Sequence, residues 1–259
     1  MDPITLIGVA TTFVLVVLFT VMEGGDPTSV LLPAPLLLVF GVTIVVCLAG
    51  GTMGDAKRII PSMKEAFLGK PAKAADVVPT VVSLAEKARR EGMLALEDEL
   101  AKIDDPFLVR GVTMAVDGTD PAELREILEG EVNAKEEEVK QSAKFFNDAG
   151  AYAPTIGIVG TVLGLVHVME NLGTPEELGH LIAAAFVATL WGVLSANAIW
   201  LPLGSRIKRL GQLEVSRMEL VIEGVAAIQS GSNPRLVAQK LESLLPVADR
   251  PSTAEKKAA

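Results

Sequence analysis

Cysteine is nearly absent from this chain of 259 residues, and the single copy, Cys47, lies in an apolar stretch. One cysteine excludes both a disulfide framework and a zinc cluster within one chain. The net charge of −9 and the lack of a basic stripe with interleaved aromatic residues argue against nucleic-acid binding. The charged part of the chain contains no nucleophile–base pair, metal-spaced cluster or phosphate-binding loop. We therefore expect no enzyme, no metal site and no cofactor.

Charged residues are missing from two apolar segments, residues 151–169 and 181–203, which contain no Asp, Glu, Lys or Arg. Each is long enough to cross a bilayer, which takes roughly 20 apolar residues. Two earlier apolar runs, residues 4–22 and 34–53, bring the expected membrane spans to four. If the charge-free pair lines an ion path, another chain must supply the carboxylate that holds the ion.

Basic residues are missing from the links between these spans. Residues 23–33 and 170–180 contain acidic side chains but no Lys or Arg, and all 23 basic residues lie between the second and third spans or after the fourth. The positive-inside rule therefore predicts that both termini and the insert at 54–148 are cytoplasmic. The run at 4–22 follows an acidic start and has no small-residue cleavage pattern after it, so we expect it to remain as an anchor.

The predicted fold is an all-α membrane protein with a helical cytoplasmic insert between its second and third transmembrane helices. Residues 1–53 hold the first two transmembrane helices and residues 149–203 hold the other two. The insert occupies residues 54–148. Residues 204–259 form a cytoplasmic helix extension of the fourth span, and the stretch DRPSTAEKKAA at its end is expected to be disordered.

The insert shows helical patterns separated by breaks. Residues 56–67 have apolar residues at helical spacing and predict an amphipathic helix at the inner membrane surface, ended near Pro71. A helical pair around Gly92 and a helix over 106–118 follow. Asp120 before Pro121 predicts the N-cap of a helix that continues into the third span.

Hydroxyls and glycines stand out in the charge-free pair. Thr161 and Thr189 either bond back to carbonyls of their own helices or face a hydrated pore, where they coordinate or relay an ion. The third span also carries glycines that let helices approach closely in lipid, namely Gly157, Gly160 and Gly164.

Pro154 and Pro202 lie near the inner ends of the third and fourth spans. A proline within a helix removes one backbone hydrogen bond, so each either bends or stops the helix at the membrane surface or acts as a hinge. His167 is the histidine within the spans. It is either a solvated imidazole at the outer interface or a proton relay.

Charges of both signs surround an apolar face in the insert. On one continuous helix, Arg90 and Glu97 would point within about 20° of each other because they are a heptad apart. Such charges, with the neighbouring Arg89, usually form a solvated face with salt bridges.

Three segments carry a resemblance. REGMLALE at 90–97, APTIGIVGTVLGLV at 153–166 and FVATLWGVLSANAIWLPL at 186–203 resemble the flagellar motor stator subunits of the MotA and PomA type, in the MotA/TolQ/ExbB proton channel family. The resemblance covers nearly the whole chain. The family's alternative function is a TolQ- or ExbB-like energiser of outer-membrane processes, and a membrane scaffold without ion flux is a further alternative.

The resemblance implies a stator subunit of the bacterial flagellar motor in the cell inner membrane. Five such subunits surround two copies of a MotB- or PomB-type single-span protein, whose membrane Asp binds the ion. The flow of H⁺ or Na⁺ then drives rotation of the rotor protein FliG and cell motility.

The resemblance also assigns roles to residues. Thr161 and Thr189 lie on the ion pathway, and the residue type at Thr161 favours Na⁺ slightly. Pro154 and Pro202 couple ion flow to shape. The rotor-facing charges are Arg89, Arg90 and Glu97.

Overall fold

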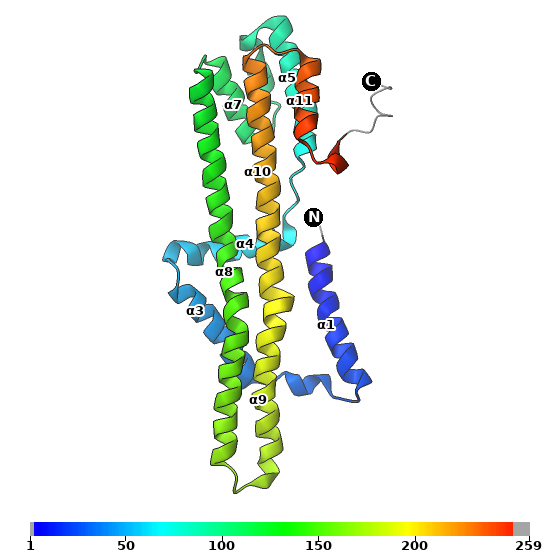
Figure 1. Ribbon diagram of the computed structural model, residues 1–259, viewed down its shortest axis with the longest axis vertical. Coiled ribbons are helices and arrows are strands. Elements are labelled where there is room, and N and C mark those ends of the chain that lie inside the picture. The colour runs from blue at the N-terminus through cyan, green and yellow to red at the C-terminus, as the bar shows by residue number, and fades with distance from the viewer. Residues whose placement is uncertain (1–2, 251–259) are drawn as a thin grey trace. The chain divides into compact units, whose positions relative to one another are not determined.

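The computed structural model describes residues 3–250, and every regular element within them is a helix (Figure 1). The predicted all-α fold class is confirmed. Most of the tail predicted to be disordered lies outside the described residues. The chain divides into two compact units, one formed by residues 1–70 and 139–209 and the other by residues 71–138 and 210–259.

The first unit begins with α1 (Ile4–Met22), which is uniformly apolar and has no buried residue. After the short 3₁₀ turn η1 (Pro27–Val30), a second apolar helix is formed by α2 (Pro33–Leu36), the π-helical turn η2 (Leu37–Val42) and α3 (Thr43–Ala49). This composite helix has 17 residues, which is at the lower end of the range that crosses a bilayer.

The prediction that the second apolar helix extends to residue 53 is wrong, because a new helix begins there. The Thr52 hydroxyl accepts a hydrogen bond from the Asp55 amide at 3.3 Å, and the Asp55 carboxylate accepts one from the Thr52 amide at 2.8 Å. This reciprocal capping box starts α4 (Met53–Leu68). As predicted, α4 is amphipathic and ends before Pro71; it runs across α8 rather than along it (Figure 1).

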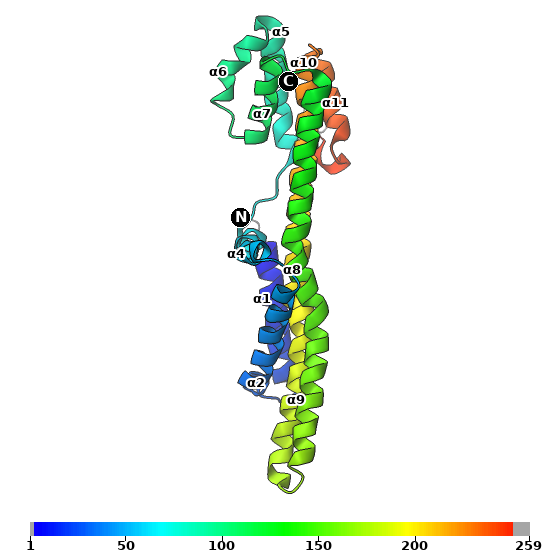
Figure 2. The same cartoon turned by 90° about the vertical axis from the view of Figure 1, so that its left-hand side faces the viewer.

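One long helix and one helix interrupted by a π-helical turn carry the rest of the apolar sequence. The helix α8 (Pro121–Glu170) begins at Asp120, whose carboxylate accepts a hydrogen bond from the Ala122 amide at 2.9 Å, as the sequence predicts. The helix α9 (Pro175–Ser195) passes through a π-helical turn, η5 (Ala196–Trp200), into α10 (Leu201–Gln229). In both views α8 and α9 lie side by side (Figures 1 and 2).

Within residues 3–250, three helices are long and apolar enough to cross a membrane: α1, α8, and the continuous helix from Pro175 to Gln229. The third and fourth predicted spans are therefore parts of helices that continue well beyond them. This continuation was expected, because Asp120 predicted the start of a helix that enters the third span and residues 204–259 were predicted to extend the fourth.

The second unit is a bundle of short helices packed on parts of α8 and α10 (Figure 2). Its remaining elements are η3 (Ala74–Val77), α5 (Val78–Glu91), η4 (Met93–Leu96), α6 (Glu97–Leu100), α7 (Pro106–Val116), α11 (Pro234–Leu244) and η6 (Val247–Asp249). Leu96, Leu128 and Val225 are fully buried in its apolar core.

Ion pairs on the surface of this core join elements far apart in the sequence. Asp105 caps α7 by accepting a hydrogen bond from the Phe107 amide at 3.0 Å, and it also pairs with Arg217 of α10. Glu223 of α10 pairs with Arg125 of α8 at 2.5 Å and with Lys240 of α11 at 2.6 Å. One carboxylate thus connects three helices.

Candidate functional site

The two threonines of the charge-free helix pair meet at the interface of α8 and α9. The hydroxyl oxygens of Thr161 and Thr189 are in direct hydrogen-bond contact. Thr161 Oγ1 also lies 2.9 Å from the Ala185 carbonyl oxygen across the interface and 3.2 Å from the Gly157 carbonyl of its own helix. Thr189 Oγ1 lies 3.4 Å from the same Gly157 oxygen. Thr161 therefore contacts a carbonyl of its own helix and a carbonyl of α9.

Small residues bring the two helices close enough for this contact. A Cβ added to Gly157 would lie 2.8 Å from the Ala188 carbonyl oxygen, and one added to Gly164 would lie 2.7 Å from the Ala185 Cβ. At Gly160 an added Cβ would meet both Ala188 of α9 and Leu38 of η2. All three glycines therefore face elements that pack on α8, where only hydrogen fits.

The other side of the interface is also built from small residues. Ala185 and Ala188 are each 2% exposed, and a Cβ added to Gly192 would lie 2.7 Å from the Ala153 carbonyl oxygen. These three residues of α9 were not among the candidates predicted from the sequence. Their spacing of three and four positions places them on one helical face, and this is the signal that could have identified them.

The hydroxyl pair is polar but carries no charge. Two hydroxyl oxygens and two backbone carbonyl oxygens are the ligand types that replace water around an alkali cation or pass a proton. The two apolar segments that form the site contain no Asp, Glu, Lys or Arg. Within residues 3–250, no group of three or more His, Cys, Asp and Glu side chains is arranged to hold a metal ion.

The two prolines lie inside continuous helical chain, so the interpretation as helix stops is wrong for both. Pro154 is in the interior of α8, and its Cα would lie 3.3 Å from a Cβ added to Gly192. Pro202 is the second residue of α10, directly after the π-helical turn η5. Because proline has no N–H, the α-helical bond to the Ala198 carbonyl cannot form, and the wider turn accommodates this loss.

An aromatic cluster beside the site was not assigned a role from the sequence. The Trp191 ring centroid lies 6.1 Å from Phe13 of α1 and 5.9 Å from Phe40 of η2. The Trp191 Nε1–H donates to the Val30 carbonyl oxygen at 2.7 Å. Through these contacts Trp191 links α9 to α1, η1 and η2. It lies two residues after Thr189 in the sequence.

His167 is away from the hydroxyl pair, near the end of α8. Its side chain is exposed, and its Nδ1 lies 3.4 Å from a carboxylate oxygen of Glu170, the last residue of that helix. Six residues separate it from Thr161, which corresponds to roughly 9 Å along a helix. This position fits an imidazole at the interface better than a relay that contacts the pair.

The charged segment of the second unit is not one continuous helix. The helix α5 ends at Glu91, and Gly92 has φ +91°, a conformation that favours glycine, before Glu97 starts α6. The continuous helix on which Arg90 and Glu97 would share a face does not form, and helices lie on both sides of Gly92 as predicted. Arg90 lies 3.8 Å from Glu91, whereas Arg89 and Glu97 form no ion pair with any residue in 3–250.

A different pair forms the internal salt bridge of this segment. Lys87 Nζ lies 2.7 Å from Glu99, which also pairs with Lys102 at 3.0 Å. The hydrogen bond from Lys87 lowers the pKa of the Glu99 carboxyl below its ordinary value. The Lys87–Glu99 salt bridge joins α5 to α6 without Arg89 or Glu97. Both of these side chains are exposed.

Comparisons with known proteins identify the family. The sequence profile of the "MotA/TolQ/ExbB proton channel family" matches residues 99–220. Over 256 residues the chain is 36% identical to Motility protein A of Bacillus subtilis (strain 168), covering 98% of this chain and 95% of that protein. The chain belongs to the MotA/TolQ/ExbB proton channel family. The resemblance seen in the sequence is confirmed.

Solved structures agree with this membership. C. jejuni MotAB matches with a TM-score of 0.92 and 29% identity, covering 98% of this chain and 100% of that one. The flagellar MotAB stator complex from Bacillus subtilis matches with a TM-score of 0.88 and 36% identity, covering 95% and 97%. The profile of the MotA/TolQ/ExbB family includes both threonines and both prolines, but begins after Arg89 and Glu97.

Proposed function

We propose that this chain is the torque-generating stator subunit of a bacterial flagellar motor, which forms an ion channel with a MotB-type partner. The observation that carries this function is the hydroxyl pair in an uncharged, closely packed helix pair. It stands in a chain similar over nearly its full length to Motility protein A. No observation favours the TolQ- or ExbB-like alternative over the stator.

The absence of charge at the pair explains why a partner is needed. Moving a cation into the bilayer without a compensating charge costs several kcal/mol of solvation free energy. Coordination by two hydroxyls offsets only part of this cost. A carboxylate on a single-span MotB- or PomB-type partner supplies the missing charge. The proposed assembly places five copies of this chain around two copies of that partner in the cell inner membrane.

The proposed topology has four spans and both termini in the cytoplasm. The absence of Lys and Arg between spans one and two and between spans three and four supports it. The shortest span, Pro33–Ala49, has 17 residues and covers roughly 26 Å as a helix, which is close to the thickness of the hydrocarbon core.

Ion passage at the hydroxyl pair is proposed to change helix shape through the two prolines. Pro154 lies one turn from Gly157 of the site, and Pro202 follows the π-helical turn. The exposed charges of Arg89, Arg90 and Glu97 then contact the rotor protein FliG.

Thr189→Val tests the ion-pathway role. Valine matches threonine in shape but removes the hydroxyl, so we expect loss of swimming while the complex with the partner still assembles. Thr189→Ser keeps the hydroxyl and should retain most swimming. Swimming is measured in soft agar, and assembly is measured by co-purification. Normal swimming of Thr189→Val would contradict a pathway through this hydroxyl.

The transported ion is H⁺ or Na⁺, and we propose Na⁺ because Thr161 adds a second hydroxyl to the site. Swimming speed at fixed pH should then rise with sodium concentration, with potassium replacing sodium to keep ionic strength constant. Speed that is independent of sodium but falls when a protonophore is added would assign H⁺ instead.

A further inference from the structure

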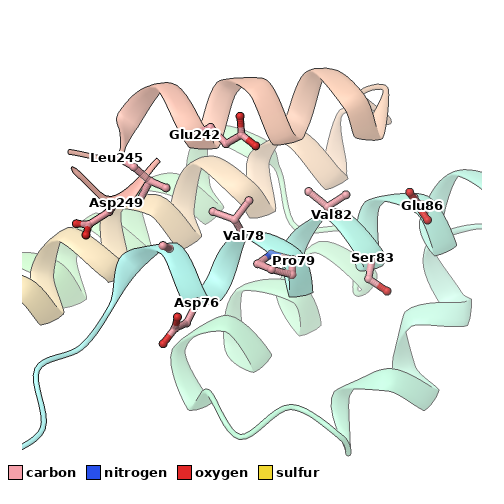
Figure 3. A pocket seen from close by; sticks show the side chains of 10 residues that line it. Asp76, Val78, Pro79, Val82, Ser83, Glu86, Glu242, Leu245 and Asp249 are labelled. Atoms are coloured by element: carbon pink, nitrogen blue, oxygen red, sulfur yellow. The ribbon is translucent and has the colours of Figure 1, made fainter. Parts of the chain in front are cut away.

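An open groove of about 820 Å³ lies within the second unit, between α5 and the chain from α11 to η6 (Figure 3). Its floor is apolar and is formed by Val78, Pro79, Val82 and Leu245. Its rim is acidic and is formed by Asp76, Glu86, Glu242 and Asp249. No Lys or Arg is among the residues that line it.

Three of the rim carboxylates, those of Asp76, Glu86 and Asp249, are available to a cationic group. Within residues 3–250, Asp76, Glu86 and Asp249 form no ion pair. A groove with an apolar floor and an anionic rim fits a lysine, because a lysine covers apolar surface with its aliphatic stem and places its ammonium group at the edge. The groove therefore favours a short lysine-containing segment over a purely apolar one.

The same chain contains a lysine-containing segment that begins next to the groove. Arg250 follows Asp249 of the rim and is held in place by two hydrogen bonds. Its Nε donates to the Leu245 carbonyl at 2.9 Å, and its Nη2 donates to the Ser243 carbonyl at 3.0 Å. The following nine residues, outside the described part, read PSTAEKKAA and contain Lys256 and Lys257.

We propose that this groove binds the C-terminal segment 255–259 of its own chain, with the ammonium groups of Lys256 and Lys257 at the carboxylates of Asp76, Glu86 and Asp249. Lys256 is six positions after Arg250, a length of chain that reaches at most roughly 20 Å, so the segment can lie along the groove without rearrangement of η6. The proposal goes beyond the stator function and does not depend on it.

The C-terminal segment should bind the groove weakly, so that a competing ligand can displace it. Exposed ion pairs change an equilibrium by only a few-fold each, and salt screens them. The short tether raises the effective concentration of the segment to about the millimolar range, so an interaction of this strength is populated but readily displaced. The groove is thus occupied at rest and becomes free when a more basic ligand competes.

Disulfide trapping tests the proposal, because the sole native cysteine can be removed. In the full-length protein with its partner in membranes, Cys47→Ala is combined with Ala258→Cys and with Val82→Cys in the groove. The matched control pairs Ala258→Cys with Ser243→Cys, an exposed position close to where the segment leaves Arg250. A segment that samples space without preference reaches Ser243 at least as fast as it reaches Val82.

We expect the groove pair to form its intrachain disulfide about fivefold faster than the control pair. Lys256→Glu with Lys257→Glu, or salt near 1 M, should bring the two rates together, because two exposed ion pairs are worth about this factor. Equal rates without these changes would overturn the proposal. A disulfide between two copies would overturn the same-chain form and assign the groove to a neighbouring subunit. Swimming is not the readout, so failure here is distinct from failure of the stator function.

Discussion

One backbone oxygen organises the hydroxyl pair. The Gly157 carbonyl lies within hydrogen-bond distance of both Thr161 and Thr189, at 3.2 and 3.4 Å. The approach of Thr189 to it requires that α9 lie against the bare Cα of Gly157. At the scale of single residues, the polar chemistry of the site therefore depends on a position without a side chain.

Gly157→Ala should separate the two hydroxyls. The added Cβ would lie 2.8 Å from the Ala188 carbonyl oxygen, so α9 must move, at a cost of about 1–3 kcal/mol. We expect a lower melting temperature of the purified complex and loss of swimming. Gly130→Ala in the same helix is the control, because no described atom lies within 4 Å of its added Cβ. That change should stabilise the helix slightly.

Glu223 should make the stability of the second unit depend on pH. Hydrogen bonds from Lys240, and then from Arg125, lower the pKa of its carboxyl from the ordinary 4.5, although burial opposes this. A folded-state pKa below the unfolded value gives stability that is present above the unfolded pKa and is lost as pH falls through the folded one.

We therefore expect the urea midpoint, followed by pulse proteolysis of the full-length protein, to fall as the pH drops below about 4.5. Glu223→Gln should lower the midpoint near neutral pH by the equivalent of about 1 kcal/mol and flatten its dependence on acid. Glu219→Gln, at an exposed position of the same helix, should leave the profile unchanged. Parallel profiles of wild type and Glu223→Gln would contradict this role.

At the scale of elements, the sequence was sufficient where a local signal determines the structure. The N-cap at Asp120 and the apolar periodicity predicted the start of α8 and its continuation into the membrane, and the charge-free run of α1 gave its bounds. The capping box at Thr52 is also a local signal, but it lies within the apolar run 34–53. The predicted end of the second span, residue 53, is therefore four residues beyond the observed end of α3 at Ala49.

Other features were not predictable because they depend on contacts between helices. The sequence identified Thr161 and Thr189 as candidates but not which face each occupies, because the packing of α8 on α9 decides this. The π-helical turn η5 and the link from Trp191 to Val30 likewise involve segments far apart in the chain.

At the scale of the whole molecule, the exposed charges of the second unit should act on the rotor and not on the channel. Arg89 and Glu97 take no part in the Lys87–Glu99 bridge that joins α5 and α6. Reversing both, as Arg89→Glu with Glu97→Lys, should therefore leave folding and ion leak unchanged while it reduces torque several-fold. Torque is measured from the rotation of tethered cells under load.

Arg235→Glu, at another exposed position of the same unit, is the matched control for this charge reversal. Its torque should equal that of the wild type. If the double reversal also leaves torque unchanged, Arg89 and Glu97 belong to an ordinary solvated surface. A loss of torque together with increased ion leak would indicate damage to the channel instead.

The π-helical turn η5 also limits how this gene can change. Such a turn holds one more residue than the α-helix around it, and each residue in a helix turns the chain by about 100°. Deletion of any one residue between Ala196 and Trp200 would rotate Thr189 away from Thr161 while Leu203 stayed in place. Selection should therefore reject every insertion or deletion in this segment, whichever side chains occupy it.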